Sequence, residues 1–374
     1  MTEQQVHAPP TAIRWDEIVA AVPSEALDCL QTGVAVLADV IGGPGAHRGL
    51  GARPWFPAPG GTGYAEAADL TARLAQARDE LGLLSAPPEK VTDLADLDGR
   101  DGPLYVVADA FDLPWVPYAR HEHMSHSFVL ARAKEGWDVV DAYHNDTQWG
   151  PARPGVWSRT DEQIAELLAC GPVLVTMLRS GAVPVRPPVP SAAGIDAYAL
   201  AERTSEAAVE QLVLDVWLIE RDRRLHLRWL DDHSPEEAEV WRSAGRVETW
   251  QRLAARTYLA LRRLRRGHPV GREVVDEVCR QLRVDAELTG TAEFPAIREV
   301  VLTAVGETLA IDPAAVAGAP TLRELPGFDS FRLVDVLERV ERELRADLPE
   351  DLGADDLGDV DGLVRLFTRA TVRR

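Results

Sequence analysis

Three residues that could form a nucleophilic site are spread over the first 141 positions of the chain. Cys29 stands near the start of a predicted buried helix, whose N-terminal end favours the nucleophilic thiolate. His126 opens the apolar strand 126–132, and Asp141 lies near the end of the next strand, 136–143. In such a set the cysteine attacks a carbonyl, the histidine moves the proton, and the aspartate fixes the imidazole tautomer.

The element that must position two of these residues is a hairpin. The short turn 133–135 joins the two strands and predicts antiparallel pairing. Pairing through this turn places His126 near Asp141 or its close neighbours. Three further histidines stay open as alternatives for the base, and they are His121, His123 and His144.

The remaining cysteines give no sign of disulfide or zinc chemistry. Cys170 and Cys279 lie far apart, and the chain has no Cys-x-x-Cys pair. We expect Cys170 to be buried near a helix end and Cys279 to be packed inside a helix. A metal site of His121, His123 and His126 is a further alternative, since alternate residues of a strand share a face, but no cysteine or carboxylate partner is evident there. We therefore predict no metal site.

The order of a helix-borne cysteine, a strand opening on histidine and a strand ending on aspartate resembles the papain-like fold. The closer resemblance is to the N-terminal domain of butirosin biosynthesis protein H and its relatives, over roughly residues 22–180. Four segments carry it: 28–31, 109–115, 126–130 and 139–141. The resemblance implies transfer of an acyl group from a carrier-protein thioester to an amine, with Cys29, His126 and Asp141 as the catalytic residues.

One part of this site is unassigned in the sequence. The backbone N–H of Cys29, at the helix start, supplies one donor for an oxyanion. The glutamine that papain-type enzymes carry several residues before the nucleophile is absent, and Pro23 and Ser24 occupy that region. This gap favours an alternative in which the domain is an inactive scaffold that docks partner enzymes. A simple thioesterase is the other alternative.

A second reactive group stands near the C-terminus, where a loop ending in Asp329-Ser330 opens into an amphipathic helix. Leucines and valines recur there at helical spacing, and the intervening positions are mostly charged. A serine at such a position is commonly an N-cap, so the residues around it must decide its role.

Residues 293–370 resemble an acyl or peptidyl carrier protein domain. The segment 327–331, Gly-Phe-Asp-Ser-Phe, resembles the family's Gly-x-Asp-Ser-Leu signature, with Phe331 in place of the usual leucine or methionine. The resemblance implies that Ser330, beside Asp329, carries covalent 4′-phosphopantetheine. The helix N-terminus would place positive potential beside the phosphate.

Together the two resemblances imply an enzyme of natural-product biosynthesis, in the secondary metabolism that makes nonribosomal peptides and antibiotics. The triad would take an acyl or aminoacyl group from a phosphopantetheine thioester and give it to an amine, or release it by cyclisation. The implied partners are a phosphopantetheinyl transferase, an adenylating or acyl-loading enzyme, and an amine or other small-molecule acceptor.

Composition excludes some functions. The chain has 374 residues and a formal net charge of −20, which argues against nucleic-acid binding. No apolar run is long enough to span a membrane, and the N-terminus lacks the pattern of a secretory signal. We therefore expect a cytoplasmic protein without membrane partners.

The elements divide the chain into three predicted parts. Residues 1–183 form an α+β, papain-like domain with an antiparallel sheet, and a proline-rich stretch ends it. Residues 184–290 form an all-α extension, and residues 293–374 an all-α, four-helix carrier domain. Arginine clusters at 221–228 and 262–266 are interpreted as solvated helix surface, with docking of an acidic carrier domain as the sharper alternative.

Overall fold

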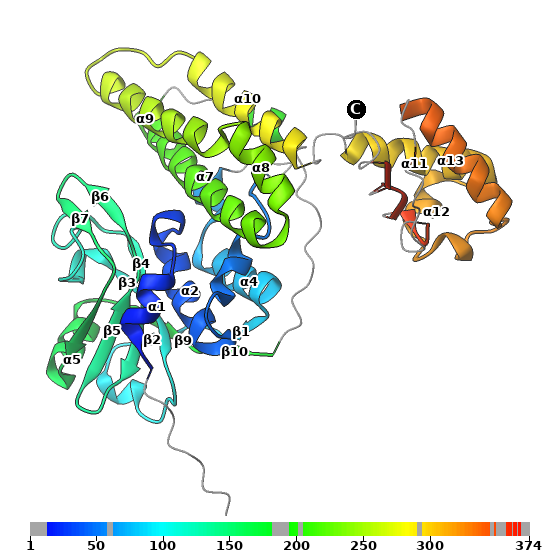
Figure 1. Ribbon diagram of the computed structural model, residues 1–374. Helices are drawn as coiled ribbons and strands as arrows, with labels where there is room; N and C mark the ends of the chain where they lie inside the picture. The colour runs from blue at the N-terminus through cyan, green and yellow to red at the C-terminus, as the bar shows by residue number, and fades with distance from the viewer. Residues whose placement is uncertain are drawn as a thin grey trace, which may run out of the picture. The chain divides into compact units, whose positions relative to one another are not determined.

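The computed structural model describes residues 13–57, 63–181, 194–200, 205–289, 294–344, 348, 357–360, 362–364 and 366–367 (Figure 1). The chain divides into two compact units. The first comprises residues 1–55, 63–188 and 202–270, and the second comprises residues 56–62, 189–201 and 271–374. The predicted linker at 184–190 lies outside the described residues, so the predicted three-part division stays a prediction.

The first unit is built on a six-stranded sheet in which every neighbouring pair is antiparallel. Across the sheet the strands are β2 (Glu89–Val91), β9 (Val173–Thr176), β3 (Leu104–Asp109), β4 (Ser125–Arg132), β5 (Trp137–Asp141) and β8 (Gly155–Arg159). Two small pairs flank it: β1 (Leu83–Ser85) with β10 (Leu178–Ser180), and β6 (Asn145–Thr147) with β7 (Gly150–Ala152). The predicted mixed α+β class with antiparallel sheet is confirmed.

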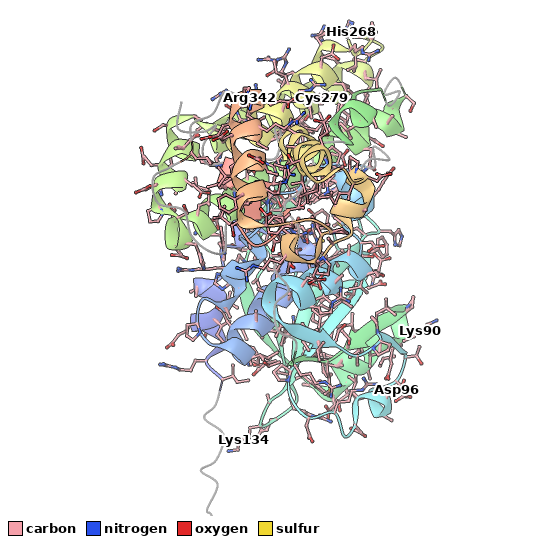
Figure 2. All side chains as sticks on the ribbon, turned by 90° about the vertical axis from the view of Figure 1, so that its right-hand side faces the viewer. Lys90, Asp96, Lys134, His268, Cys279 and Arg342 are labelled. Atoms are coloured by element: carbon pink, nitrogen blue, oxygen red, sulfur yellow. The ribbon has the colours of Figure 1, made fainter. Side chains whose placement is uncertain are left out.

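The predicted hairpin is β4 and β5. Val129 pairs with Val140, and Arg132 pairs with Trp137. Gly136 has φ 72°, and a Cβ there would meet the Arg159 carbonyl oxygen at 2.2 Å, so the turn requires glycine. Lys134 lies exposed in this turn (Figure 2).

Helices cover both faces of the sheet. On one face α2 (Cys29–Gly42) buries the run Leu30–Asp39 against β3 and β4, together with residues of α1 (Trp15–Ala21) and α4 (Leu70–Leu81). On the other face α5 (Asp161–Cys170) packs with η3 (Leu94–Leu97) and η4 (Ala110–Asp112). The two apolar clusters meet at Cys29, which contacts both.

Three helices complete the first unit. They are α7 (Glu206–His233), α8 (Pro235–Ser243) and α9 (Arg246–Leu264), and they lie side by side (Figure 1). Helix α7 also contacts η1 (Ser24–Ala26), η2 (Ala46–Gly51) and α3 (Tyr64–Ala67). The interpretation of the 221–228 cluster as solvated surface is wrong for Arg221 and Arg223, which are buried, whereas the four arginines at 262–266 are exposed.

In the second unit α6 (Ile195–Leu200) packs on α10 (Glu273–Leu288). Helices α11 (Phe294–Leu309), α12 (Pro313–Ala317) and α13 (Ser330–Leu344) share an apolar core with the 3₁₀ turn η6 (Leu322–Glu324). Val360, Leu363, Val364 and Phe367 complete this core and are helical, and most of the segment predicted to connect them to α13 lies outside the described residues. The helical C-terminal part is confirmed.

The other two cysteines have different outcomes. Cys279 is buried in α10, as predicted. The prediction that Cys170 is buried is wrong, because this residue lies on the face of α5 away from the buried residues and is exposed. None of the helices in the described ranges is both long and apolar enough to cross a membrane.

Candidate active site

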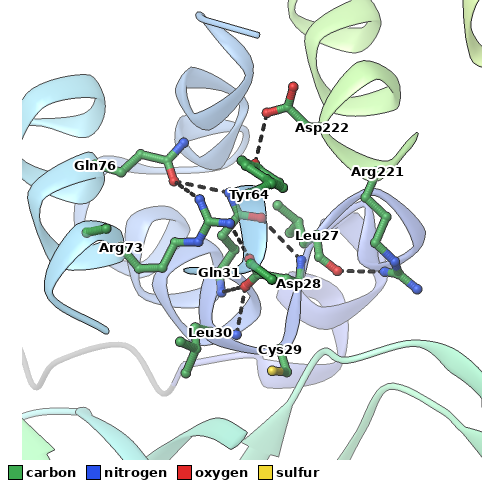
Figure 3. Close-up of polar contacts among 12 residues, drawn as sticks. Leu27, Asp28, Cys29, Leu30, Gln31, Tyr64, Arg73, Gln76, Arg221 and Asp222 are labelled. Carbon is green, nitrogen blue, oxygen red and sulfur yellow. Dashed lines mark hydrogen bonds and ion pairs between the residues drawn. The ribbon is translucent and has the colours of Figure 1, made fainter. Parts of the chain in front are cut away.

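Cys29 is the first residue of α2, and the preceding aspartate fixes that helix end. Asp28 Oδ1 accepts the backbone N–H groups of Leu30 at 2.8 Å and Gln31 at 2.7 Å (Figure 3). The Gln31 side chain accepts the Asp28 N–H in return at 3.2 Å, which completes a capping box. The N–H of Cys29 itself meets no acceptor within the described part of the chain. It is therefore free to donate to a ligand.

His126 and Asp141 form a buried pair at the other side of the site. His126 Nε2 donates to Asp141 Oδ2 over 2.7 Å, and the two residues are 0% and 2% exposed. The last pair of the β4–β5 ladder is Val129 with Val140, so Asp141 follows it by one residue and His126 precedes it by three, at the same end of the hairpin. The predicted proximity of His126 and Asp141 is confirmed.

Two further groups hold the Asp141 carboxylate. Trp115 Nε1 donates to Oδ2 over 3.1 Å, and the backbone N–H of Tyr143 donates to Oδ1 over 2.9 Å. The Tyr143 ring packs edge-on against the His126 ring, with centroids 5.1 Å apart. The Asp141 carboxylate thus accepts three hydrogen bonds, which hold it in place. Sequence reasoning gave no role to Trp115 or Tyr143.

The second nitrogen of the His126 ring is one of three buried side-chain nitrogens without a hydrogen-bond partner among the described residues, and the other two are Nε of Arg73 and Nε of Arg221. Nδ1 is buried and makes no hydrogen bond within the described residues. Burial lowers the pKa of His126, but the charge and hydrogen bond of Asp141, together with the interaction with Cys29, outweigh it and raise the pKa to about 10. The Cys29 thiol therefore lies beside this ring, and it donates to the Ser125 carbonyl over 3.4 Å. The direction of this shift favours the protonated imidazole, the form that a thiolate–imidazolium pair requires.

The start of α2 is fastened directly to the sheet. Ser127 Oγ donates to the Cys29 carbonyl over 2.6 Å, and Tyr105 Oη donates to the Leu30 carbonyl over 2.8 Å. A Cβ on Gly33 would come within 2.9 Å of both side chains. Glycine one turn after the nucleophile is therefore what lets the helix approach β3 and β4 closely.

Arg221 of α7 joins the two loops that carry the reactive residues. Its Nη1 donates to the carbonyls of Ser24 at 3.0 Å and Leu27 at 2.6 Å, just before the nucleophile. Its Nη2 donates to the His144 carbonyl at 2.7 Å, just after Asp141. Burial lowers the pKa of Arg221.

A second buried cation supports the helix cap itself. Arg73 pairs with Asp28 and lies over the ring of Tyr64, 5.5 Å from its centroid (Figure 3). Tyr64 Oη donates to Asp222 of α7 over 3.2 Å. Burial lowers the pKa of Arg73, but the charge of Asp28 outweighs it and raises the pKa. The cap of α2 is thus linked through α3 and α4 to α7.

The alternative histidines are placed elsewhere. His121 stacks on Trp149 with centroids 5.4 Å apart, and His123 donates to Asp109 over 2.7 Å. His144 contributes its carbonyl to Arg221, so of the four histidines only His126 meets Asp141. No cluster of His, Cys, Asp and Glu that could hold a metal is found among the described residues.

Ser330 is the exposed first residue of α13. Asp329 accepts the N–H groups of Phe331 at 2.9 Å and Arg332 at 2.8 Å through Oδ1. The aspartate therefore provides the N-cap, which leaves the Ser330 hydroxyl without that structural task. Gly327 adopts φ 77° in the preceding turn, and the side chain of Phe331 is 85% exposed.

Comparison with known proteins adds no assignment: no protein-family model matches the chain, and no curated protein matches it.

Proposed function

We propose that the first unit is a cysteine acyltransferase that takes an acyl group from a carrier-protein thioester and passes it to an amine. The observation that carries this proposal is the state of His126. One ring nitrogen is held by buried Asp141 at 2.7 Å, and the other is buried, unbonded and beside the thiol at the start of α2. A histidine satisfied for structural reasons alone would have partners for both nitrogens.

The chemistry follows from these contacts. The Cys29 thiolate attacks the thioester carbonyl, and the oxyanion forms beside the free Cys29 N–H. When the carbon–sulfur bond breaks, His126 gives its Nδ1 proton to the leaving thiolate, and the acyl group remains on Cys29 as a thioester. An amine then attacks this carbonyl while His126 accepts its proton, and Cys29 leaves as the thiolate. Asp141 keeps its charge throughout and holds Nε2–H.

We assign the second oxyanion donor to the hydroxyl of Tyr143. Burial and the charge of Cys29 raise the pKa of Tyr143, so the Tyr143 hydroxyl keeps its proton. The effect of Cys29 on this pKa also indicates that the two side chains lie near each other. Tyr143 and Tyr118 share a hydrogen bond of 3.4 Å, and Asn145 donates to Tyr118 over 2.8 Å. Tyr118 can therefore donate its O–H to the Tyr143 oxygen, which leaves the Tyr143 O–H to donate a hydrogen bond to the oxyanion.

We further propose that Ser330 carries 4′-phosphopantetheine. The supporting observation is that Asp329, not Ser330, caps α13, so the exposed serine hydroxyl is available for modification beside a helix N-terminus. When bound, this group supplies a thiol on a long arm that holds the acyl chain as a thioester.

Intact-protein mass spectrometry tests both parts. A phosphopantetheinyl transferase with coenzyme A should add one phosphopantetheine mass to the wild type and none to Ser330→Ala. With an acyl group loaded on that arm and an amine supplied, the wild type should lose the acyl mass and form the amide. Cys29→Ala should retain it.

The matched control is Cys170→Ser, which removes an exposed thiol outside the site and should leave transfer unchanged. Equal loss of the acyl group from wild type and Cys29→Ala would refute the acyltransferase. Free acid in place of amide would identify a thioesterase. A mass gain that persists in Ser330→Ala would refute the carrier assignment.

A further inference from the structure

A cleft of about 360 Å³ opens beside the proposed nucleophile. Ser125, whose carbonyl accepts the Cys29 thiol at 3.4 Å, forms part of its wall. The rest of the lining comes from the ends of β3, β4 and β9 and includes the apolar side chains Val107, Met124 and Leu174. A carbonyl bound to Cys29 would have this cleft as a neighbouring space for its chain.

The polar end of the cleft is a carboxylate held by histidine. Asp109 is the cross-strand partner of Ser125 in the β3–β4 ladder, so it lies about 5 Å across from the wall that touches the thiol. His123 donates to Asp109 Oδ2 over 2.7 Å, and the N–H groups of Phe111 and Met124 donate to Oδ1 at 3.0 and 3.1 Å. A carboxylate oxygen has two acceptor positions, so Oδ2 keeps one for a ligand.

The Asp109 carboxylate keeps its negative charge near neutral pH. Burial raises the pKa of Asp109, but the hydrogen bonds from His123, Phe111 and Met124 outweigh it and lower the pKa below its ordinary value. The Asp109 side chain is 35% exposed, which leaves it accessible from the cleft. An apolar passage that ends in an accessible carboxylate favours a ligand with a short hydrocarbon stem and a positive end.

We propose that this cleft is the acyl-chain site and that it selects acyl groups bearing an ammonium a few atoms from the thioester carbonyl. The proposal rests on the acyltransferase function proposed above. The one-strand separation of Asp109 from Ser125 sets the length, since a chain of two to four carbons reaches from Cys29 to Asp109. The apolar walls hold the stem, and Asp109 Oδ2 accepts the ammonium.

The test compares two pantetheine thioesters of equal size, 3-aminopropanoyl and butanoyl, in which an ammonium replaces a methyl group. The full chain is used without phosphopantetheine on Ser330, in a Cys170→Ser background that removes the exposed competing thiol. The rate of Cys29 acylation is followed by intact mass. We expect the aminoacyl thioester to react roughly tenfold faster per unit concentration, the effect of one hydrogen bond to a charged group.

Asp109→Asn is the discriminating variant, because its side-chain oxygen can still accept the Phe111 and Met124 N–H groups while the charge is lost. The ratio of the two rates should fall to about one. His123→Gln is the matched control, since the glutamine amide can still donate to Asp109, and it should keep the preference.

Equal rates for the two thioesters in the protein that keeps Asp109 would overturn the proposal. A preference for the aminoacyl thioester that survives Asp109→Asn would overturn it too. The first of these needs no variant, so the proposal stays testable even if Asp109→Asn folds poorly. Failure of every thioester to acylate Cys29 is a different result. It would overturn the acyltransferase function, and the selectivity proposal with it.

Discussion

Replacing Arg221 by methionine should both destabilise the first unit and disable the site. The variant keeps the aliphatic stem but removes three charged hydrogen bonds to carbonyl oxygens, at 3.0, 2.6 and 2.7 Å. Each such bond contributes about 1.5–3 kcal/mol, and the desolvation of a side chain that is 5% exposed offsets part of the sum. We expect a net loss of about 3–5 kcal/mol in the free energy of unfolding.

Urea unfolding followed by tryptophan fluorescence measures the stability of the first structural unit. All ten tryptophans lie between residues 15 and 250, at positions within the first unit, so the signal reports that unit alone. Activity should fall by roughly 100-fold in kcat/KM, because displacement of the reacting groups by about 1 Å has that effect. Arg221→Lys, which keeps the charge but has fewer directed donors, should recover part of both losses.

The matched control is Arg228→Met on the same helix. Arg228 pairs with Glu25 of the same loop but is exposed, so its loss should lower the free energy of unfolding by less than about 1 kcal/mol. A loss in Arg221→Met no larger than in Arg228→Met would refute the reasoning. So would full activity in a destabilised Arg221→Met protein, since it would show that the two loops need no common support.

Four further outcomes are expected. Gly33→Ala should lower the free energy of unfolding by about 1–3 kcal/mol and reduce kcat, because its Cβ would sit 2.9 Å from Ser127 Oγ and from the Tyr105 ring; equal stability would show that the helix can shift freely. Asp141→Asn should place an amide N–H₂ against one of the three groups that donate to Asp141, and it removes the charge that raises the His126 pKa. An NMR titration of His126 should therefore find a pKa well below about 10. Tyr143→Phe should reduce kcat roughly 100-fold with little change in KM, and an unchanged kcat would remove it as an oxyanion donor. Since the pKa of His126 is raised in the folded state from about 6.5 to about 10, its stabilising contribution is complete below pH 6.5 and is lost as the pH rises toward 10, so the stability difference between wild type and His126→Gln should shrink over that interval.

Local patterns predicted the parts of the site that depend on short-range structure. The His126–Asp141 contact follows from a three-residue turn between two apolar strands, because a tight hairpin leaves little freedom of register. The start of α2 follows from Asp28 and Gln31, which form a capping box by themselves. Both features depend on residues that lie close together in the chain, so they can be predicted from the sequence alone.

The predictions that were wrong concern residues whose surroundings are decided by tertiary packing and not by their neighbours in the sequence. Arg221 is 194 residues from the Leu27 carbonyl that it binds, and its sequence neighbours are charged, so solvated surface was the natural prediction. Only tertiary structure provides the three carbonyls that make its burial tolerable. The prediction for Cys170 was wrong because an apolar helix end was expected to be buried, whereas Cys170 lies four residues after exposed Glu166, on the face of α5 away from the buried Ile164, Leu167 and Leu168.

Helix α7 therefore belongs to the architecture of the proposed catalytic site and is more than an appended helical segment. Its Arg221 binds the loops on both sides of the site, and its Asp222 accepts the Tyr64 hydroxyl, whose ring supports the Arg73 that pairs with Asp28. If the Arg221 guanidinium were lost while the helix stayed in place, the carbonyls of Ser24, Leu27 and His144 would lose their donor, at a cost of about 1–3 kcal/mol for each that stays buried. The proposed catalytic unit therefore includes α7, because the segments around Cys29 and Asp141 are held from this helix as well as from the sheet.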